Sequence, residues 1–198
     1  MANERRIGAS DSQSRAHLLD VAEAMMLAEG YSAVTSRKLG QRAGVSPQLV
    51  HYYFRTMDEL FVEVFRRRAE ENLARIAAAL EGDSSLLAIW KLTSNPLGAA
   101  FNVEFAALAN HRKEIRSEIA TYGERFRRLQ HDAVASRLDV LGVDPGTCPP
   151  SAVLLAMTGM ATVMSIEETM GLTAGHREAR EFVERFLGDL DSGTRPTT

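Results

Sequence analysis

The sequence predicts an all-α protein with about nine helices. Apolar residues recur at spacings of three and four along nearly the whole chain, which is typical of amphipathic helices. No segment alternates apolar and polar residues between turn signals, as a half-buried strand would. The chain has 198 residues, which is long enough to bury a core without disulfides or metals, and its single cysteine, Cys148, cannot form an intramolecular disulfide.

The first two expected helices are bounded by clear start and stop residues. Apolar residues from Leu18 to Ala28 form the stripe of the first helix, and Gly30 is its expected end. Thr35 is the expected N-cap of a short helix that stops at Gly44.

The third helix is predicted by Ser46 as its N-cap and Pro47 at its first position, where the missing N–H does no harm. Val50 and Phe54 are its four-spaced apolar pair, so they are expected to face inward. Thr56 opens a long fourth helix. The remaining helices are expected at about residues 85–90, 97–109, 115–142, 151–170 and 173–190.

Charge is distributed unevenly along the chain. There are 23 basic and 26 acidic residues, a net charge of −3, which alone argues against a nucleic-acid-binding protein. Residues 32–57, however, contain four basic residues and no Asp or Glu, so the rest of the chain carries −7. A basic window in an acidic protein is the electrostatic footprint that a nucleic-acid-binding surface needs.

Residues 35–54 have the pattern of a helix-turn-helix, two short helices joined by a tight turn. Glutamine can bond an adenine edge and leucine can touch a thymine methyl group. Hydroxyls, arginines and a helix N-terminus suit phosphate oxygens. The candidate DNA-contacting residues are Thr35, Ser36, Arg37, Ser46, Pro47, Gln48, Leu49, His51, Tyr52, Tyr53, Arg55 and Thr56.

The run from Arg15 to Leu60 contains a specific set of residues, namely Glu29-Gly30-Tyr31, Thr35, Arg42-Ala43-Gly44-Val45-Ser46-Pro47, Tyr53-Phe54 and Leu60. In these residues the run resembles the TetR family of bacterial transcriptional regulators. The match covers roughly residues 12–72, and the rest of the chain is similar to the family only in length and helical layout.

Two positions depart from the family pattern. The chain has Val50-His51 where the family favours Leu-Tyr, and Met57 where it favours Lys. A phosphate contact cannot therefore be transferred to Met57, and a contact from His51 does not follow from the resemblance.

The resemblance implies a DNA-binding domain at residues 12–72 and a ligand-binding and dimerisation domain at residues 73–191. Residues 1–11 and 192–198 are expected to be disordered tails. It also implies a homodimer on a palindromic double-stranded DNA operator. In such a homodimer the last two helices pair with their symmetry mates as a four-helix bundle, and the middle helices enclose a pocket for a small effector. The expected function is a repressor that a small apolar or amphipathic ligand releases from DNA.

A glutamate interrupts the apolar stripe of the helix at residues 97–109. Leu97, Phe101 and Leu108 lie within about 40° of each other on a helical wheel, and Glu104 falls inside that stripe. A buried carboxylate needs a partner, either an arginine, which is the commoner case, or a ligand. The candidate ligand-contacting residues are Trp90, Phe101, Asn102, Glu104, Phe105, Met157, Met160 and Met164.

The helix at residues 151–170 has two apolar faces. One face, Val153, Met157, Met160 and Met164, is either core or the wall of an adaptable pocket. The other consists of small residues and permits close approach of a symmetry mate. With the apolar face of the last helix it gives the candidate dimer-interface residues Ala152, Ala156, Gly159, Val163, Phe182 and Phe186.

Two other classes of protein are disfavoured. An enzyme would need a phosphate loop, a nucleophile elbow or a metal-spaced histidine pair, and the sequence has none, so no catalytic residue, metal or cofactor is expected. His111 with Glu114 and Glu118 is a poor metal chelate. A scaffold that binds only protein would not need the basic window.

The chain is expected to be cytoplasmic. Its N-terminus has no apolar segment of the kind that a signal peptide contains. The apolar run Ala152 to Ile166 has 15 residues, which is too short to span a membrane.

Overall fold

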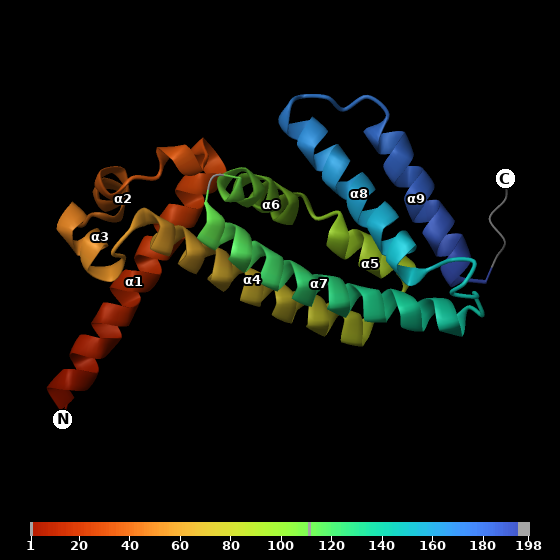
Figure 1. Ribbon diagram of the computed structural model, residues 1–198, viewed down its shortest axis with the longest axis horizontal. Helices are drawn as coiled ribbons and strands as arrows, with labels where there is room; N and C mark the ends of the chain where they lie inside the picture. The colour runs from red at the N-terminus through yellow and green to blue at the C-terminus, as the bar shows by residue number, and fades with distance from the viewer. Residues whose placement is uncertain (1, 111, 194–198) are drawn as a thin grey trace. The chain divides into compact units, whose positions relative to one another are not determined.

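The computed structural model describes residues 2–110 and 112–193, and its helices are labelled in Figure 1. Within these ranges it contains nine α-helices, a single-turn 3-10 helix and no strand, so the all-α prediction is confirmed. The elements are α1 (Ala2–Glu29), η1 (Tyr31–Ala33), α2 (Ser36–Ala43), α3 (Pro47–Tyr53), α4 (Met57–Gly82), α5 (Leu86–Thr93), α6 (Pro96–Ala109), α7 (Lys113–Val140), α8 (Pro150–Thr169) and α9 (His176–Asp191).

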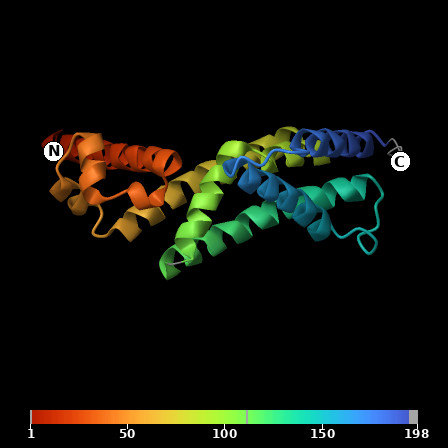
Figure 2. The ribbon, with the colours of Figure 1, turned by 90° about the horizontal axis from the view of Figure 1, so that it is seen from above.

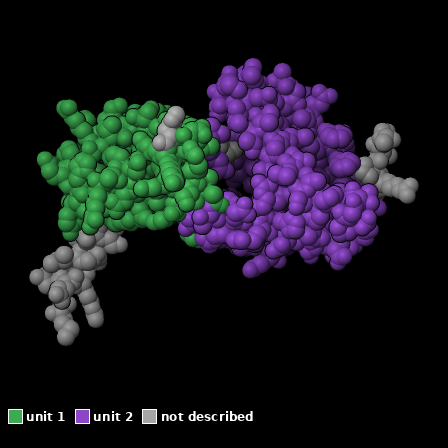
Figure 3. Space-filling model, viewed as in Figure 1, with its two compact units in different colours: residues 1–70, 104–120 green, residues 71–103, 121–198 purple. Residues whose placement is uncertain are grey.

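The chain forms two compact units, coloured separately in Figure 3. Unit 1 consists of Met1–Glu70 and Glu104–Ala120, and unit 2 of Glu71–Val103 and Thr121–Thr198. The first break lies close to the boundary expected at residue 72. The return of residues 104–120 to unit 1 was not expected, because no local pattern reveals which distant helix a segment packs against.

The N-terminal part of unit 1 is built on α1, with α2 and α3 beside it (Figures 1 and 2). Leu18, Ala22 and Met25 are almost fully buried on α1, as the predicted stripe requires. The helix ends where the Gly30 N–H donates to the Met26 carbonyl, 2.9 Å away, and Gly30 adopts φ 79°. Gly30 therefore ends the helix, as expected.

The start of α1 differs from the expectation of a disordered tail. The helix begins at Ala2, so the segment expected to be a tail through residue 11 continues α1 instead. The physical reason is that this segment contains no proline and several good helix formers, so nothing in it stops a helix that extends outward from the apolar stripe. At the other end of the chain, residues 194–198 of the expected tail lie outside the described residues, and Ser192 and Gly193 follow α9.

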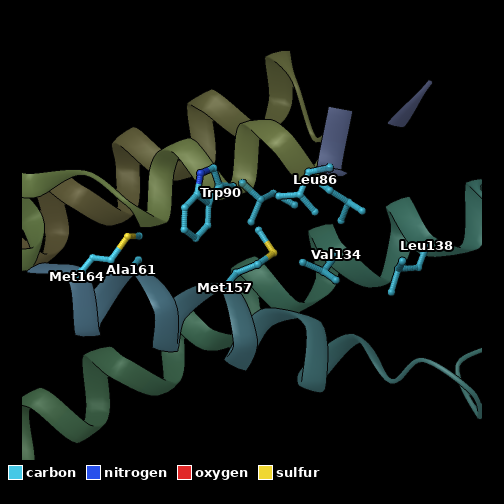
Figure 4. Close-up of a cluster of buried hydrophobic side chains, with 9 residues drawn as sticks. Leu86, Trp90, Val134, Leu138, Met157, Ala161 and Met164 are labelled. Atoms are coloured by element: carbon cyan, nitrogen blue, oxygen red, sulfur yellow. The ribbon is translucent and has the colours of Figure 1, made fainter. Parts of the chain in front are cut away.

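Unit 2 is organised around α5, which packs against both α8 and α9. Its core, part of which is shown in Figure 4, consists of buried side chains from α5, α7, α8 and α9, namely Leu86, Ile89, Trp90, Val134, Leu138, Met157, Ala161, Met164 and Leu187.

A carboxylate from the end of α9 caps the N-terminus of α5. Asp191 Oδ1 accepts from the Leu86 N–H at 3.1 Å, and Asp191 Oδ2 accepts from the Leu87 N–H at 3.0 Å. Arg137 on α7 donates through Nε to the same carboxylate at 2.8 Å and through Nη2 to the Asp191 carbonyl at 2.6 Å. One acidic residue of α9 thus ties together α5, α7 and α9.

Helix α8 is longer than its apolar run. It has 20 residues, because Pro149-Pro150 begins it ahead of the run and Glu167 to Thr169 extend it. By length and composition alone it could cross a membrane, so the expectation that this stretch is too short is wrong. A single such helix is weak evidence for a membrane span. Five of its residues are buried, and three of these, Met157, Ala161 and Met164, belong to the core of unit 2.

Candidate functional site

Each helix of the helix-turn-helix has a local cap. Thr35 Oγ1 accepts from the Lys38 N–H at 3.3 Å, and Ser46 Oγ accepts from the Leu49 N–H at 3.2 Å. Gly44 adopts φ 69° between the two helices, a left-handed conformation that favours glycine. The structure therefore confirms the caps and the turn that the sequence predicted.

The turn also requires a residue without a side chain at Gly40. A Cβ atom built there would lie 2.8 Å from the Val45 carbonyl oxygen, and the Val45 N–H donates to the Gly40 carbonyl at 2.8 Å. This close approach sets the angle at which α3 leaves the turn. The requirement for glycine at residue 40 was not predicted from the sequence, because it depends on the packing of α2 against α3.

Helix α3 presents one face to the interior and one to solvent. Val50 and Phe54 are at most 1% exposed, as predicted. Gln48 and His51 are exposed and Tyr52 is 70% exposed, whereas the other candidates on this helix, Pro47, Leu49 and Tyr53, are half-buried. The Tyr52 and Tyr53 rings meet edge to face with centroids 5.1 Å apart. The structure therefore exposes Gln48, His51 and Tyr52 on the solvent face of α3 and leaves the other three candidates only partly accessible.

The four basic residues of the window have different surroundings. Arg37 and Lys38 are exposed near the start of α2, beside the exposed Thr35 and the half-buried Ser36. Arg42 forms an ion pair with Glu29. Its charge is thus partly neutralised by an acidic residue just outside the window, which a count of charges could not reveal.

Arg55 and Thr56 lie where α3 gives way to α4. Thr56 Oγ1 accepts from the Glu59 N–H at 3.1 Å, and Glu59 Oε2 accepts from the Arg55 N–H at 2.8 Å. This pattern is similar to a capping box, except that Glu59 accepts from Arg55, the residue before the N-cap Thr56. It leaves the side chains of Arg55 and Thr56 exposed at the same end of the helix-turn-helix.

A network of ion pairs joins α1, α4 and α7 within unit 1. Arg66 donates to both Glu118 oxygens, at 2.9 and 2.6 Å, and to Glu63 at 3.1 Å, while Arg15 donates to Glu63 at 2.6 Å. The hydrogen bond from Arg66 lowers the pKa of Glu118, and the same bond raises the pKa of Arg66. Burial alone would raise the pKa of Glu63, but the bonds from Arg15 and Arg66 lower it.

A second contact joins the α6–α7 connection to α4. Arg112 Nε lies 3.1 Å from Asp58 Oδ1, and its guanidinium lies over the Phe61 ring, 5.3 Å from the centroid. Both contacts hold residues 104–120 against the first turns of α4. Neither contact could be predicted from the sequence, because contacts between residues so far apart in the chain leave no local pattern.

Glu104 has a partner that neither sequence alternative included. Its Oε2 accepts from the Tyr31 main-chain N–H at 3.1 Å, and no arginine pairs with it among the described residues. The carboxyl is half-buried and lies in unit 1. The expected arginine pair is therefore not formed, and a ligand contact from Glu104 stays untested.

The other ligand candidates fall into both units. Trp90, Met157 and Met164 meet in the core of unit 2 (Figure 4), and the Trp90 Nε1 is buried without an acceptor among the described residues. Phe101 is buried, Asn102 is exposed and Met160 is 38% exposed. Phe105 is buried in unit 1, with its ring 5.1 Å from that of Phe65.

The six dimer-interface candidates are all exposed in the single chain. On α9, Phe182 is 55% and Phe186 is 38% exposed, and their rings stack with centroids 5.9 Å apart. On α8, the small residues Ala152, Ala156 and Gly159 share their exposure with larger apolar neighbours, Leu155, Val163 and Ile166. Monomeric proteins rarely expose extended apolar patches, and those that occur commonly mark interaction sites.

The described residues contain no group of three or more His, Cys, Asp or Glu side chains that could hold a metal ion. His111, from the weak chelate considered above, lies outside the described residues, and Glu118 is engaged by Arg66.

Comparison with known proteins agrees with this geometry. Residues 18–64 match the family model described as bacterial regulatory proteins, tetR family. The chain is 26% identical over 122 residues to the HTH-type transcriptional regulator BetI of Rhizobium meliloti (strain 1021). This alignment covers 57% of the chain and spans only 60% of the length of that relative.

Solved structures share the fold over most of the chain. A transcriptional regulator from Rhodococcus sp. Rha1 matches with a TM-score of 0.69 at 17% identity, covering 90% of this chain and 94% of the other. A TetR transcription regulator from Haloarcula marismortui matches with a TM-score of 0.70 at 16% identity, covering 92% and 98%. The TetR family consists of regulators rather than enzymes. The helix-turn-helix thus lies in a segment, residues 18–64, that is similar to the tetR family of bacterial regulatory proteins, and the fold of the chain is shared with a solved TetR transcription regulator.

Proposed function

We propose that the protein is a cytoplasmic, homodimeric transcriptional regulator. It binds a palindromic DNA operator through the helix-turn-helix and represses transcription until a small apolar or amphipathic ligand releases it. The observation that carries the proposal is the exposure of Gln48, His51 and Tyr52 on α3, together with that of Arg37 and Lys38 on α2, the helix that packs against α3. This surface combines groups that read bases with groups that bind phosphates.

Gln48 and Arg37 have different tasks in this proposal. Gln48 is exposed in the first turn of α3 and reads a base edge, whereas Arg37 and Tyr53 hold phosphates. The two-fold symmetry of a homodimer demands a palindromic operator, with recognition-helix centres about 34–36 Å apart or a longer near-integral number of turns.

The experiment is selection of bound duplexes from a random pool, followed by affinity measurements over a range of salt concentrations. Gln48→Ala should relax the preference at one symmetric pair of positions by about 1–3 kcal/mol. Arg37→Ala should weaken all sequences alike and reduce the salt slope by about one unit. The opposite assignment of effects would reverse the roles. Selection of no sequence by the wild-type protein would refute DNA recognition and favour a protein-binding scaffold.

Dimerisation through α8 and α9 is supported by their exposed apolar faces. Gly159 has open space around the position of a Cβ atom in the single chain, with no neighbouring group within 4 Å of that position. Gly159→Arg and Ala156→Arg should therefore leave the fold intact but put a charge into the dimer seam, giving monomers without specific DNA binding. Sedimentation that finds wild-type-like dimers for both variants would refute this interface.

The ligand is proposed to enter unit 2 beside Trp90, Met157 and Met164. Flexible thioethers can move to admit an apolar ligand. An indole N–H buried without an acceptor costs free energy that a ligand oxygen could recover. Trp90 is the only tryptophan of the chain, so its fluorescence would report binding directly. A ligand that releases the operator while leaving this fluorescence unchanged would exclude the site.

A further inference from the structure

The connection between α1 and α2 is held by a residue from a distant helix. Tyr31 follows Gly30, whose φ of 79° and ψ of 159° fall in a region that is essentially restricted to glycine. The Tyr31 N–H donates to Glu104 Oε2, 73 positions further along the chain. As the first residue of η1, Tyr31 has no N–H partner within that turn, so Glu104 supplies the acceptor that the turn lacks.

The turn that Glu104 holds leads directly into the proposed DNA-binding surface. η1 continues through Ala33, the buried Val34 follows, and Thr35 then caps α2. We propose that Glu104 is a positioning residue for DNA binding. Its carboxylate fixes η1, and with it the start of α2 that carries Thr35, Ser36 and Arg37. This inference rests on the proposed function.

Glu104 is suited to this task because its own segment is anchored elsewhere in unit 1. Residues 104–120 are joined to α4 by the contact of Arg112 with Asp58 and by the two hydrogen bonds from Arg66 to Glu118. An acceptor on an anchored segment restricts the donor more than an acceptor on a free loop would, because less side-chain and main-chain entropy opposes the bond.

Simple electrostatics makes the opposite prediction about this residue. Removing a negative charge from a protein that binds phosphates strengthens binding unless the residue has another role. A positioning role predicts weaker binding when the acceptor is lost. The sign of the effect therefore separates the two accounts.

The test compares Glu104→Met, which removes the acceptor, with Glu104→Gln, whose amide oxygen can still accept the Tyr31 N–H. Glu114→Met and Glu114→Gln are the matched controls, because Glu114 is exposed in the same unit and has no partner among the described residues. Affinity is measured for a duplex that the wild-type protein selects from a random pool. Hydrogen exchange of the Tyr31 amide, followed by NMR without DNA, reports the contact itself.

We expect Glu104→Met to remain folded and to bind about tenfold more weakly than Glu114→Met, with faster exchange at Tyr31. Glu104→Gln should stay within about twofold of Glu114→Gln, since the conservative variant rescues the hydrogen bond. If Glu104→Met does not fold, Glu104→Asp takes its place, because the shorter side chain keeps the charge but withdraws the acceptor. In that case we expect the same loss of affinity relative to the wild-type protein.

Equal or tighter binding by Glu104→Met than by Glu114→Met would overturn the inference, and so would unchanged exchange at Tyr31. A wild-type protein that selects no DNA would instead refute the proposed function, and the positioning role would fall with it. The Tyr31 amide would still decide whether the hydrogen bond exists, so the two failures are distinguishable.

Discussion

Replacing Asp191 with alanine should destabilise unit 2 by about 2–4 kcal/mol. The change removes two hydrogen bonds to main-chain N–H groups of α5 and one to Arg137 Nε. Hydrogen bonds to charged groups contribute about 1.5–3 kcal/mol each, and breaking a buried ion pair costs about 3–5 kcal/mol. The side chains of Asp191 and Arg137 are 12% and 24% exposed, so water can partly replace the lost contacts and the lower part of the range applies.

Two further variants, Asp191→Asn and Arg137→Met, show how much of this loss of stability each contact accounts for. Asp191→Asn keeps an oxygen that can accept from one α5 N–H but loses the charge that attracts Arg137, so it should cost about 1–2 kcal/mol. Arg137→Met should cost less in the Asp191→Asn background than in the wild-type protein, since the two residues share one contact. Asp189→Ala is the matched control on α9, because the Asp189 carboxylate has no partner among the described residues.

The assay is urea unfolding followed by Trp90 fluorescence, which reports on unit 2 because Trp90 is fully buried in its core beside Leu86. Unfolding should be measured at several protein concentrations, since dimerisation would make the apparent stability depend on concentration. A loss for Asp191→Ala no larger than that for Asp189→Ala would show that the junction of α5, α7 and α9 does not depend on this carboxylate.

Two further predictions concern unit 1. Gly40→Ala should destabilise it by about 1–3 kcal/mol and abolish DNA binding, because the new Cβ would lie 2.8 Å from the Val45 oxygen. Gly123→Ala in α7 is the control, because a Cβ atom there has open space, and it should raise the stability measured by thermal unfolding by about 0.5–1 kcal/mol. Equal changes in stability for Gly40→Ala and Gly123→Ala would refute the steric reasoning. The hydrogen bond from Arg66 lowers the pKa of Glu118 below its ordinary 4.5. The ion pair therefore stabilises the folded state above that pH, and this stabilisation is lost as the pH falls through the lowered pKa. Glu118→Gln should have a lower free energy of unfolding than the wild-type protein at neutral pH, but this free energy should fall less between about pH 5 and pH 3. Parallel curves of unfolding free energy against pH for the variant and the wild-type protein would contradict this.

The helix-turn-helix was predictable because each of its signals is local. Thr35 and Ser46 each accept from an N–H three positions later, and Gly44 supplies the positive φ at the same turn. Val50 lies in α3 and Phe54, four positions later, is the C-cap of that helix, so the burial of both follows from helical periodicity. Such features depend on a few consecutive residues, and a sequence displays them directly.

The sequence predicted that Glu104 needs a partner, but it did not predict which group that partner is. The helical wheel correctly identified a carboxylate in an apolar stripe that needs a partner, since Phe101 and Leu108 on the same stripe are buried. It could not identify the partner, because a main-chain N–H is present at every residue and has no sequence signature. Reasoning from charge favoured an arginine, whereas the acceptor was needed by the first residue of a turn 73 positions away.

The contrast between the helix ends suggests how the two parts of the chain are constrained. Every cap found within the helix-turn-helix and at the start of α4 comes from a residue within four positions of the group that it satisfies. The Tyr31 N–H and the Leu86 and Leu87 N–H groups depend instead on Glu104 and Asp191, which are 73 and more than 100 positions away. A locally capped motif keeps its geometry whatever follows it in the chain, which suits a surface that must fit the fixed dimensions of DNA. Its placement relative to α1 is set by the distant Glu104, so a substitution on α6 can change DNA binding without altering any residue that touches DNA.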